Sequence, residues 1–461
     1  MIDTPGVRVV LDARPLQAPE RNPTTAIYLT ALLGAFSAEP RDGESFLLLL
    51  DSPGPDPSAR FPGLPMAGRR RLPPTRRLRA ATLTLDPFLL RAASIGAGFG
   101  ARTTGAAGSV FHGTGGTVPL ASGLPMVVTL LDLAPWELPA VYQRSPAERF
   151  GQRLRARLLR DAERIIVASE ATARATSRFL PFPRERIHVV RLAPVLPDAR
   201  GPDLADRLTR LRERIRLPER YLLFRGQYDA RKDLVTLLRA LVDLAGRPSP
   251  STDGEPPTTD GEPRATNGGS RATAVPWPPV LVLATSGGPD GPGGPDGPAG
   301  RDTSGGPDGS QRPPDPPTGS EAEALARLID RAGAWPFVQL TPRLDSADQA
   351  VLLAGARALV HPALVEGSGL PVIEALAAGV PVVASNVGAL TEIVGKAGIL
   401  VPPEDPRRLG AALTAVWSDE RLHARLARAT GKAVPARTRT WRDVAAETRE
   451  VYALAASRRR A

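Results

Sequence analysis

Two glutamates stand eight positions apart in the segment EGSGLPVIEALAAGVPVVAS, which covers residues 366–385. The small residues after Glu366 would let a ligand approach the backbone closely. Pro371 suits the first turn of a helix, and Gly379 stands where a left-handed residue commonly ends one. The run PVVA that follows is short, apolar and β-branched, as in a strand covered on both faces. The segment therefore predicts a loop, a short helix and a buried strand.

This pattern could bind a sugar that is joined to a phosphate. A helix N-terminus offers free N–H groups and a partial positive charge to an anion such as a diphosphate, here through the backbone of Gly369 and Leu370. Glu374 stands about one turn into the expected helix, where its carboxylate could accept hydrogen bonds from ribose hydroxyls. Glu366 precedes the helix, near the place where a phosphate-linked sugar would lie.

The same segment resembles the donor site of the family-four retaining glycosyltransferases, whose signature reads EGFGLPxxEAxAxGxPVVAS. Nearly every signature position is matched, and Ser368 stands where the family usually has Phe. The alternative is an ordinary βαβ segment with a Gly-rich turn, since such turns are common in doubly wound folds. The donor-binding residues that the resemblance implies are Glu366, Gly367, Ser368, Gly369, Leu370 and Glu374.

A second segment, GQYDARKDL at residues 226–234, follows an apolar strand and opens a helix. It is similar to the family segment whose basic residues contact the donor diphosphate, with Gly226 on the family's glycine, Arg231 on a basic position and Lys232 on the lysine. A departing diphosphate gains negative charge, which a fixed ammonium stabilises without waiting for solvent to reorganise. Gln227 replaces the usual arginine, so one positive contact is missing. Without the resemblance, Lys232 would be read as a solvated residue at a helix start.

The N-terminal half resembles a mannosyltransferase-like branch of the family in VVLDARPLQ (9–17) and VVTLLDLAPWELPAVY (127–142). In that branch a histidine contacts the transferred sugar. Leu131 occupies its position here, while Asp132 remains. We assign Asp132 to the acceptor side together with His112, which follows an apolar strand. For His112, a histidine with satisfied hydrogen bonds, or an exposed one, is favoured over this role.

The length of 461 residues favours two or three domains. The absence of cysteine excludes disulfides, zinc thiolate sites and thiol nucleophiles. The start of the sequence lacks the charged and apolar regions of a signal peptide, and no apolar run approaches the ~20 residues that span a bilayer. We therefore expect a cytoplasmic protein that is soluble or associated with the inner face of a membrane.

Arginine carries almost all of the net charge of +11. Six arginines cluster over residues 69–79, and five more recur over residues 153–164. Three explanations remain open: a solvated surface under an arginine-rich coding bias, docking on an anionic membrane, and nucleic-acid binding. The last is the least favoured, because aromatic residues make up only 5% of the chain and no nucleic-acid-binding module is recognisable.

Short apolar strands alternate with amphipathic segments, which predicts a parallel α/β architecture. Ser145 and Glu148 flank a proline in the pattern of a capping box, so a helix should begin there. The resemblance implies the GT-B fold, in which two Rossmann-like domains face each other across a cleft. The expected parts are an acceptor-side domain over 1–195, a connection over 196–218, a nucleotide-sugar domain over 219–430, and a helical tail over 431–461 that crosses back to the first domain.

Two low-complexity stretches interrupt the expected C-terminal domain, near residues 247–277 and 287–320. From Thr285 to Ser320, 32 of 36 residues are Gly, Pro, Asp, Ser or Thr. Such a composition has no apolar surface to bury. We expect both stretches to be disordered insertions without a catalytic role.

The resemblance implies a retaining transfer of a hexose from a nucleotide-diphosphate sugar to an acceptor hydroxyl, without a metal or another cofactor. Mannose is favoured through the branch resemblance, and the donor would be GDP-mannose or a UDP-sugar. A saccharide or a lipid-linked acceptor would place the enzyme in cell-surface polysaccharide or glycolipid synthesis. The catalytic residues would be Lys232, Arg231 and Glu366, and the leaving diphosphate would help to remove the acceptor proton.

Two other functions remain open. The chain could be a nucleotide-sugar-binding paralogue that has lost turnover, which the departures at Leu131, Gln227 and Ser368 would explain. It could also be an epimerase of the same fold that acts on the nucleotide sugar itself. Binding without transfer would indicate the paralogue, and a product formed from the donor alone would indicate the epimerase.

Overall fold

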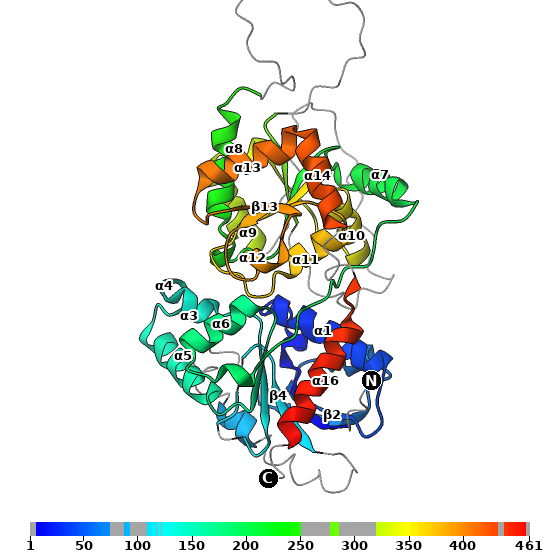
Figure 1. The fold of residues 1–461 in the computed structure, drawn as a ribbon, viewed down its shortest axis with the longest axis vertical. Helices are drawn as coiled ribbons and strands as arrows, with labels where there is room; N and C mark the ends of the chain where they lie inside the picture. The colour runs from blue at the N-terminus through cyan, green and yellow to red at the C-terminus, as the bar shows by residue number, and fades with distance from the viewer. Residues whose placement is uncertain are drawn as a thin grey trace, which may run out of the picture.

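Two parallel sheets, each covered by helices on both faces, make up the protein (Figure 1). They belong to two Rossmann-like domains that face each other, as expected for the GT-B fold. The described residues leave out most of both low-complexity stretches. They also leave out Arg76, Arg77 and Arg79 of the first arginine cluster. The computed structural model describes residues 6–73, 87–92, 108–116, 118–120, 122–249, 277–284, 320–431 and 438–457.

The N-terminal sheet has the strand order β3-β2-β1-β4-β5-β6-β7. Its strands are short and mostly buried, because helices α1 and α16 cover one face and α5 and α6 cover the other. The strands are β1 (Arg8–Asp12), β2 (Ser45–Asp51), β3 (Met66–Leu72), β4 (Ser109–Gly113), β5 (Met126–Leu130), β6 (Arg164–Val167) and β7 (Ile187–Val189). The helices are η1 (Arg14–Gln17), α1 (Pro23–Ala38), η2 (Pro57–Arg60), α3 (Ala134–Glu137), α4 (Pro139–Tyr142), α5 (Pro146–Leu159), α6 (Glu170–Phe179) and η4 (Arg184–Arg186).

The C-terminal sheet has the order β10-β9-β8-β11-β12-β13, so the strand order reverses between β8 and β11. Helices α8, α9 and α13 cover one face, and α7, α10 and α11 cover the other. The strands are β8 (Leu222–Arg225), β9 (Leu281–Ala284), β10 (Val338–Leu340), β11 (Ala358–His361), β12 (Val382–Ser385) and β13 (Gly398–Val401). The helices are α7 (Leu204–Ile215), η5 (Ala230–Lys232), α8 (Leu234–Ala245), α9 (Ser320–Ala332), η6 (Trp335–Phe337), α10 (Ser346–Ala354), α11 (Leu370–Ala377), α12 (Leu390–Ile393), α13 (Pro406–Ser418) and α14 (Glu420–Thr430).

The capping box predicted from the sequence begins helix α5. The Ser145 hydroxyl accepts a hydrogen bond from the Glu148 N–H at 3.2 Å, and the Glu148 carboxylate accepts one from the Ser145 N–H at 2.8 Å. These two bonds satisfy backbone donors that have no partner within the helix. No helix in the described part of the chain is long and apolar enough to cross a membrane.

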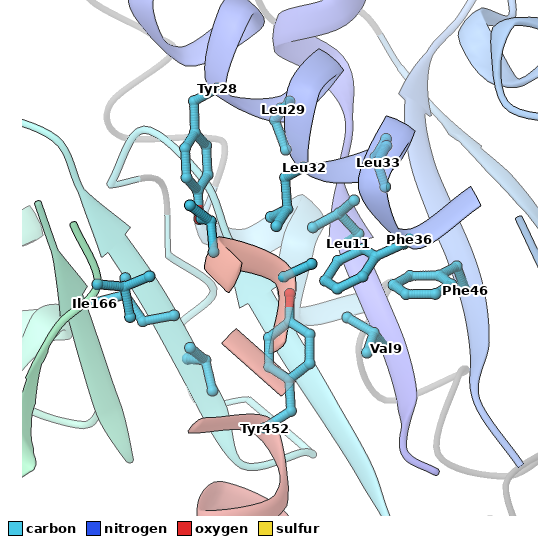
Figure 2. Close-up of a cluster of buried hydrophobic side chains, with 14 of the residues drawn as sticks. Val9, Leu11, Tyr28, Leu29, Leu32, Leu33, Phe36, Phe46, Ile166 and Tyr452 are labelled. Atoms are coloured by element: carbon cyan, nitrogen blue, oxygen red, sulfur yellow. The ribbon is translucent and has the colours of Figure 1, made fainter. Parts of the chain in front are cut away.

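Helix α16 (Trp441–Ser457) packs against α1 and strands β4, β5 and β6, so it belongs to the N-terminal core (Figure 1). Figure 2 shows Tyr452 of this helix among the side chains of that core. Arg449 forms a buried, two-pronged ion pair with Glu44, with distances of 2.9 and 2.8 Å. A charge pair without water around it requires good geometry, which this pair has.

His112 lies in this core and not at the cleft, which corrects its assignment to the acceptor side. Its side chain is completely buried. The Tyr452 hydroxyl lies 2.7 Å from its Nδ1, and the Thr129 hydroxyl lies 2.8 Å from its Nε2. Both ring nitrogens are therefore occupied by the protein. Burial lowers the pKa of His112 to about 3, so the ring is neutral.

We expect Tyr452→Phe to lower the free energy of unfolding of the N-terminal domain by about 1–3 kcal/mol, because a buried ring nitrogen of His112 loses its partner. Chemical denaturation would measure the loss. Leu454→Ala is the matched control, since Leu454 is exposed on the same helix and should change the stability by less than about 0.5 kcal/mol. Equal stability of Tyr452→Phe and the wild type would contradict the anchoring role of this bond.

Candidate active site

The candidate site lies where the strand order of the C-terminal sheet reverses. The segments that follow β8 and β11 meet there, because parallel strands end at the same edge of a sheet. They carry the two segments singled out in the sequence. Pro23, Thr24 and Ile27 of helix α1 close the site from the N-terminal domain.

The segment after β11 forms the predicted loop, helix and strand. Gly369 precedes helix α11 with a φ of +62°, a conformation that favours glycine. The helix ends in a Schellman motif, in which the N–H of Val380 donates to the carbonyl of Ala375 at 2.8 Å and that of Gly379 to Leu376 at 3.2 Å. In the first turn of α11, Pro371 has no N–H, and the N–H groups of Val372 and Ile373 donate to the carbonyl of Gly369 at 2.9 and 3.0 Å. The N–H of Leu370 is left for an anion.

Glu366 is the centre of the site. Its side chain is buried, and five donors surround its two carboxylate oxygens. Oε2 lies 2.5 Å from the Lys232 Nζ and 2.9 Å from the His361 Nε2. Oε1 accepts the N–H of Gly369 at 3.0 Å, and both the N–H and the hydroxyl of Ser368 at 3.3 Å. The carboxylate therefore fixes the ammonium of Lys232 relative to the loop.

His361 is a site residue that the sequence analysis missed. It ends strand β11, is completely buried, and lies 3.2 Å from the Lys232 Nζ through its Nε2. The only signal was its place at the end of a buried strand directly before the signature loop. Burial, and then the charge of Lys232, lower the pKa of His361 to about 4. The ring is therefore neutral at neutral pH.

The charges of Lys232 and Glu366 depend on each other. Burial lowers the pKa of the Lys232 ammonium, and Glu366 opposes that shift. Burial alone would raise the pKa of Glu366, but Lys232 and His361 hold it well below its usual value. The carboxylate is therefore ionised and supplies the counter-charge that a buried ammonium requires.

Glu374 is held by a second residue that was missed, Arg225 at the end of β8. The Arg225 Nη1 donates to Glu374 Oε2, and its Nε donates to Gln349 Oε1 at 3.1 Å. The N–H of Leu196, in the connection between the domains, lies 3.3 Å from Glu374 Oε1. The carboxylate expected to bind ribose is thus oriented by the sheet and by the connection.

Arg231 and Asp132 lie on opposite sides of the cleft and form an ion pair with a distance of 2.5 Å. Asp229 lies 3.1 Å from the Arg231 Nε and also accepts the hydroxyl of Tyr142 at 2.6 Å. Burial alone would lower the pKa of Arg231. Asp132 and the other carboxylates around it outweigh burial and raise the pKa above its usual value, so the side chain stays charged. A predicted phosphate-binding residue and a predicted acceptor-side residue therefore join the two domains.

The two domains are in close contact at Gly367. A Cβ atom on this residue would lie 2.2 Å from the carbonyl oxygen of Leu131, so only glycine fits. The hydroxyls of Ser169 and Thr172 donate to the carbonyl of Gly367 at 3.1 and 3.0 Å. The side chain of Leu131, which replaces the histidine of the related branch, lies in the N-terminal core.

The cavity at the site has a volume of about 70 Å³. Sites for small organic molecules usually measure roughly 300–1,000 Å³. The domains therefore lie closed on each other, and a ligand of nucleotide size requires contacts such as Arg231–Asp132 to separate. Of the residues predicted from the sequence, this cavity is lined by Gly226, Arg231, Lys232, Glu366, Ser368, Leu370 and Glu374.

We expect the stability of the protein to fall as the pH decreases from 7 to 5. His361 and His112 stay neutral in the folded protein down to pH values near 4 and 3, whereas an unfolded histidine binds a proton near pH 6.5. Each should lower the free energy of unfolding by about 1.4 kcal/mol per pH unit in this range. Denaturation at several pH values measures how the free energy of unfolding changes with pH. In His112→Gln this slope should be smaller by the contribution of one histidine. An unchanged slope in that variant would contradict this origin.

Comparison with known proteins identifies families and relatives whose sequences resemble this chain. Residues 37–192 match the model of Glycosyltransferase Family 4, and residues 309–433 match the model of Glycosyl transferases group 1. The chain is 34% identical over 136 residues to O-antigen chain mannosyltransferase B of Escherichia coli, which covers 30% of this chain. It is 38% identical over 135 residues to MMP alpha-(1->4)-mannosyltransferase of Mycolicibacterium hassiacum, which covers 29%. The matches cover about a third of each relative, 35% and 33% of their lengths.

The fold is also that of known glycosyltransferase structures. The crystal structure of Anabaena HepE in complex with UDP-glucose superimposes with a TM-score of 0.59 at 15% identity, over 96% of this chain and 98% of HepE. Together, the two family models and the shared fold show that the chain belongs to the group 1, family 4 glycosyltransferases of the GT-B fold.

Proposed function

We propose that the protein transfers a hexose from a nucleotide-diphosphate sugar to the hydroxyl of an acceptor. The observation that carries the proposal is the buried cluster of Lys232, Glu366 and His361 beside the N-terminus of helix α11. A buried ammonium beside a helix N-terminus suits the negative charge that develops on a departing diphosphate.

Each residue of the site has a separate role in this proposal. Lys232 stabilises the leaving diphosphate, and Arg231 joins it once the cleft opens and its pair with Asp132 separates. The N–H of Leu370 completes the phosphate site, because the N–H of Gly369 already donates to Glu366. Glu366 holds Lys232 in place and lies nearest to the donor sugar. Glu374, oriented by Arg225, accepts hydrogen bonds from the ribose.

Mannose is the sugar we favour, because two relatives with 34% and 38% identity are mannosyltransferases by name. The structural neighbour HepE binds UDP-glucose, so the donor is either GDP-mannose or a UDP-sugar. The acceptor is a saccharide or a lipid-linked saccharide in cell-surface polysaccharide or glycolipid synthesis. We place the enzyme in the cytoplasm, with its arginine clusters in contact with the anionic inner face of a membrane.

We further propose that the transfer retains the anomeric configuration and proceeds without a metal or another cofactor. In this mechanism the leaving diphosphate accepts the proton of the acceptor hydroxyl, so the site needs no separate general base. The neutral His361 and the ionised Glu366 both contact Lys232, which supports a positioning role for both. NMR of the product's anomeric proton tests retention, and inversion would contradict this part of the proposal.

We expect one nucleotide sugar among GDP-, UDP- and ADP-sugars to raise the melting temperature selectively, because a ligand of the folded state stabilises it. Glu374→Ala should weaken donor binding by about tenfold or more through the loss of ribose hydrogen bonds. Glu323→Ala is the matched control, because Glu323 is exposed on α9, away from the cleft. Unchanged donor binding in Glu374→Ala would contradict the ribose assignment.

We expect Lys232→Met to lower kcat by about 100-fold or more while donor affinity changes less, because the ammonium acts mainly as the diphosphate departs. Lys232→Met alone leaves the buried carboxylate of Glu366 without its cation, which could destabilise the fold. The double variant Lys232→Met/Glu366→Gln removes that charge, so a low kcat in it reflects lost chemistry and not lost folding. Wild-type kcat in both variants would refute the role of Lys232. Donor binding without transfer to any saccharide acceptor would instead indicate a paralogue without turnover, and product formed without acceptor would indicate an epimerase.

A further inference from the structure

A second cavity, with a volume of about 880 Å³, lies between the domains on another side of helix α11. Ile373 of this helix lines the second cavity, whereas the next residue, Glu374, lines the candidate active site. The volume is within the range of small-molecule sites. None of the residues assigned to the donor or the acceptor lines it.

The floor of this second cavity is apolar and comes from both domains. Ala168 and Leu192 follow strands β6 and β7 of the N-terminal domain and are buried. Val394, Ala397 and Leu426 belong to the C-terminal domain and are buried as well. An apolar part of a ligand would be stabilised here by about 25 cal/mol for each Å² that it removes from water.

The rim is strongly basic. Four exposed cationic side chains have no carboxylate partner within the described residues: Arg191, Lys396, Arg425 and Arg428. Arg439 also lines the cavity but is paired with Glu447 at 2.8 and 2.6 Å. Glu392 is the one acidic lining residue, and its carboxylate already accepts the N–H groups of Glu170 and Ala171 at the start of α6, at 3.1 and 2.5 Å. The rim therefore carries a positive charge that the protein does not balance.

We propose that this second cavity binds a small organic anion that combines a phosphate-like group with an apolar body. The guanidinium groups of Arg425 and Arg428 would take the anionic group, because their planar donors match phosphate oxygens. The apolar floor would take the rest of the molecule. An inorganic anion would leave the floor uncovered, and a neutral apolar molecule would leave the cations without a partner.

The position of the cavity couples this ligand to domain closure. Arg191 and Leu192 directly precede the first connection between the domains, and Arg439 precedes helix α16 at the end of the second. A ligand that contacts both domains binds more tightly to one interdomain arrangement than to another. It therefore shifts the equilibrium between these two conformations of the protein. Because closure also sets the size of the donor site, the anion should change donor affinity, and the donor should change anion affinity by the same factor. Only this coupling rests on the proposed function.

Calorimetry with the full chain tests the binding. Decyl phosphate, below its micelle concentration, supplies both chemical features, whereas pyrophosphate and decanol each supply one. We expect decyl phosphate to bind about tenfold or more tightly than either of the others. Comparable binding of decyl phosphate and pyrophosphate would overturn the role of the apolar floor, and no binding of decyl phosphate would overturn the site.

Charge reversal on the rim locates the site. Lys396→Glu/Arg425→Glu should weaken decyl phosphate binding by about tenfold or more. The control is Arg421→Glu/Arg407→Glu, which changes the net charge equally at residues that do not line the cavity. An equal loss in both variants would show that only the overall charge matters, and would overturn the site.

Two further measurements settle the source and the effect of the anion. Vesicles of phosphatidylglycerol that compete with decyl phosphate, and lose this competition in the Lys396/Arg425 variant, would identify the ligand as a membrane lipid; otherwise it is a free metabolite. Donor affinity measured with and without decyl phosphate tests the coupling, and an unchanged value would overturn it. Failure of sugar transfer would count only against the proposed function, because anion binding is measured without turnover.

Discussion

The buried carboxylate of Glu366 is the constraint on which the rest of the site depends. An ionised carboxylate that is removed from water is costly unless donors surround it. Glu366 meets this condition with donors from three places in the chain: Lys232 after β8, His361 at the end of β11, and the loop before α11. Each donor must be in position for the others to be satisfied. The site is therefore held together by one charge and not by separate contacts.

The fold makes this arrangement possible. The strand order of the C-terminal sheet reverses between β8 and β11, so the chain diverges there and leaves the ends of both strands accessible. The N-terminal domain covers this opening. Its Leu131 carbonyl can approach Gly367 of the C-terminal domain because Gly367 has no side chain. Gly367 was expected to allow a ligand near the backbone, and in the structure it allows one domain to lie near the other.

Local patterns in the sequence predicted the fold well. The capping box of α5, the loop, helix and strand after Glu366, and the parallel α/β architecture follow from spacing, turn residues and runs of apolar residues. The division into two Rossmann-like domains came from the family resemblance. These features depend on neighbours in the chain, which a sequence displays directly. The grouping of Lys232 with Glu366 came instead from the family resemblance, because the two residues are 134 positions apart.

Long-range partners could not be predicted in the same way. Arg225 ends a buried strand, and nothing in its neighbourhood indicates Glu374, which lies 149 positions later. His361 also ends a buried strand, five positions before Glu366, but its contact with Lys232 spans 129 positions. His112 is the last residue but one of strand β4, yet Tyr452 of a helix 340 positions later contacts it in the core. A polar residue near the end of a buried strand therefore belongs to the site in one sheet and to the core in the other. Only the packing of distant elements distinguishes them.

The placement of helix α16 has a consequence for synthesis on the ribosome. The N-terminal core includes Val444, Val451, Tyr452 and Ala455, which are made after the whole C-terminal domain. Chains grow at roughly 5–20 residues per second, so the first domain to emerge waits many seconds for its last helix. During this interval the surface that α16 later covers, including Phe36 and Tyr28 of α1, is exposed. The C-terminal domain has all of its own strands earlier, so the domain made second can finish folding first.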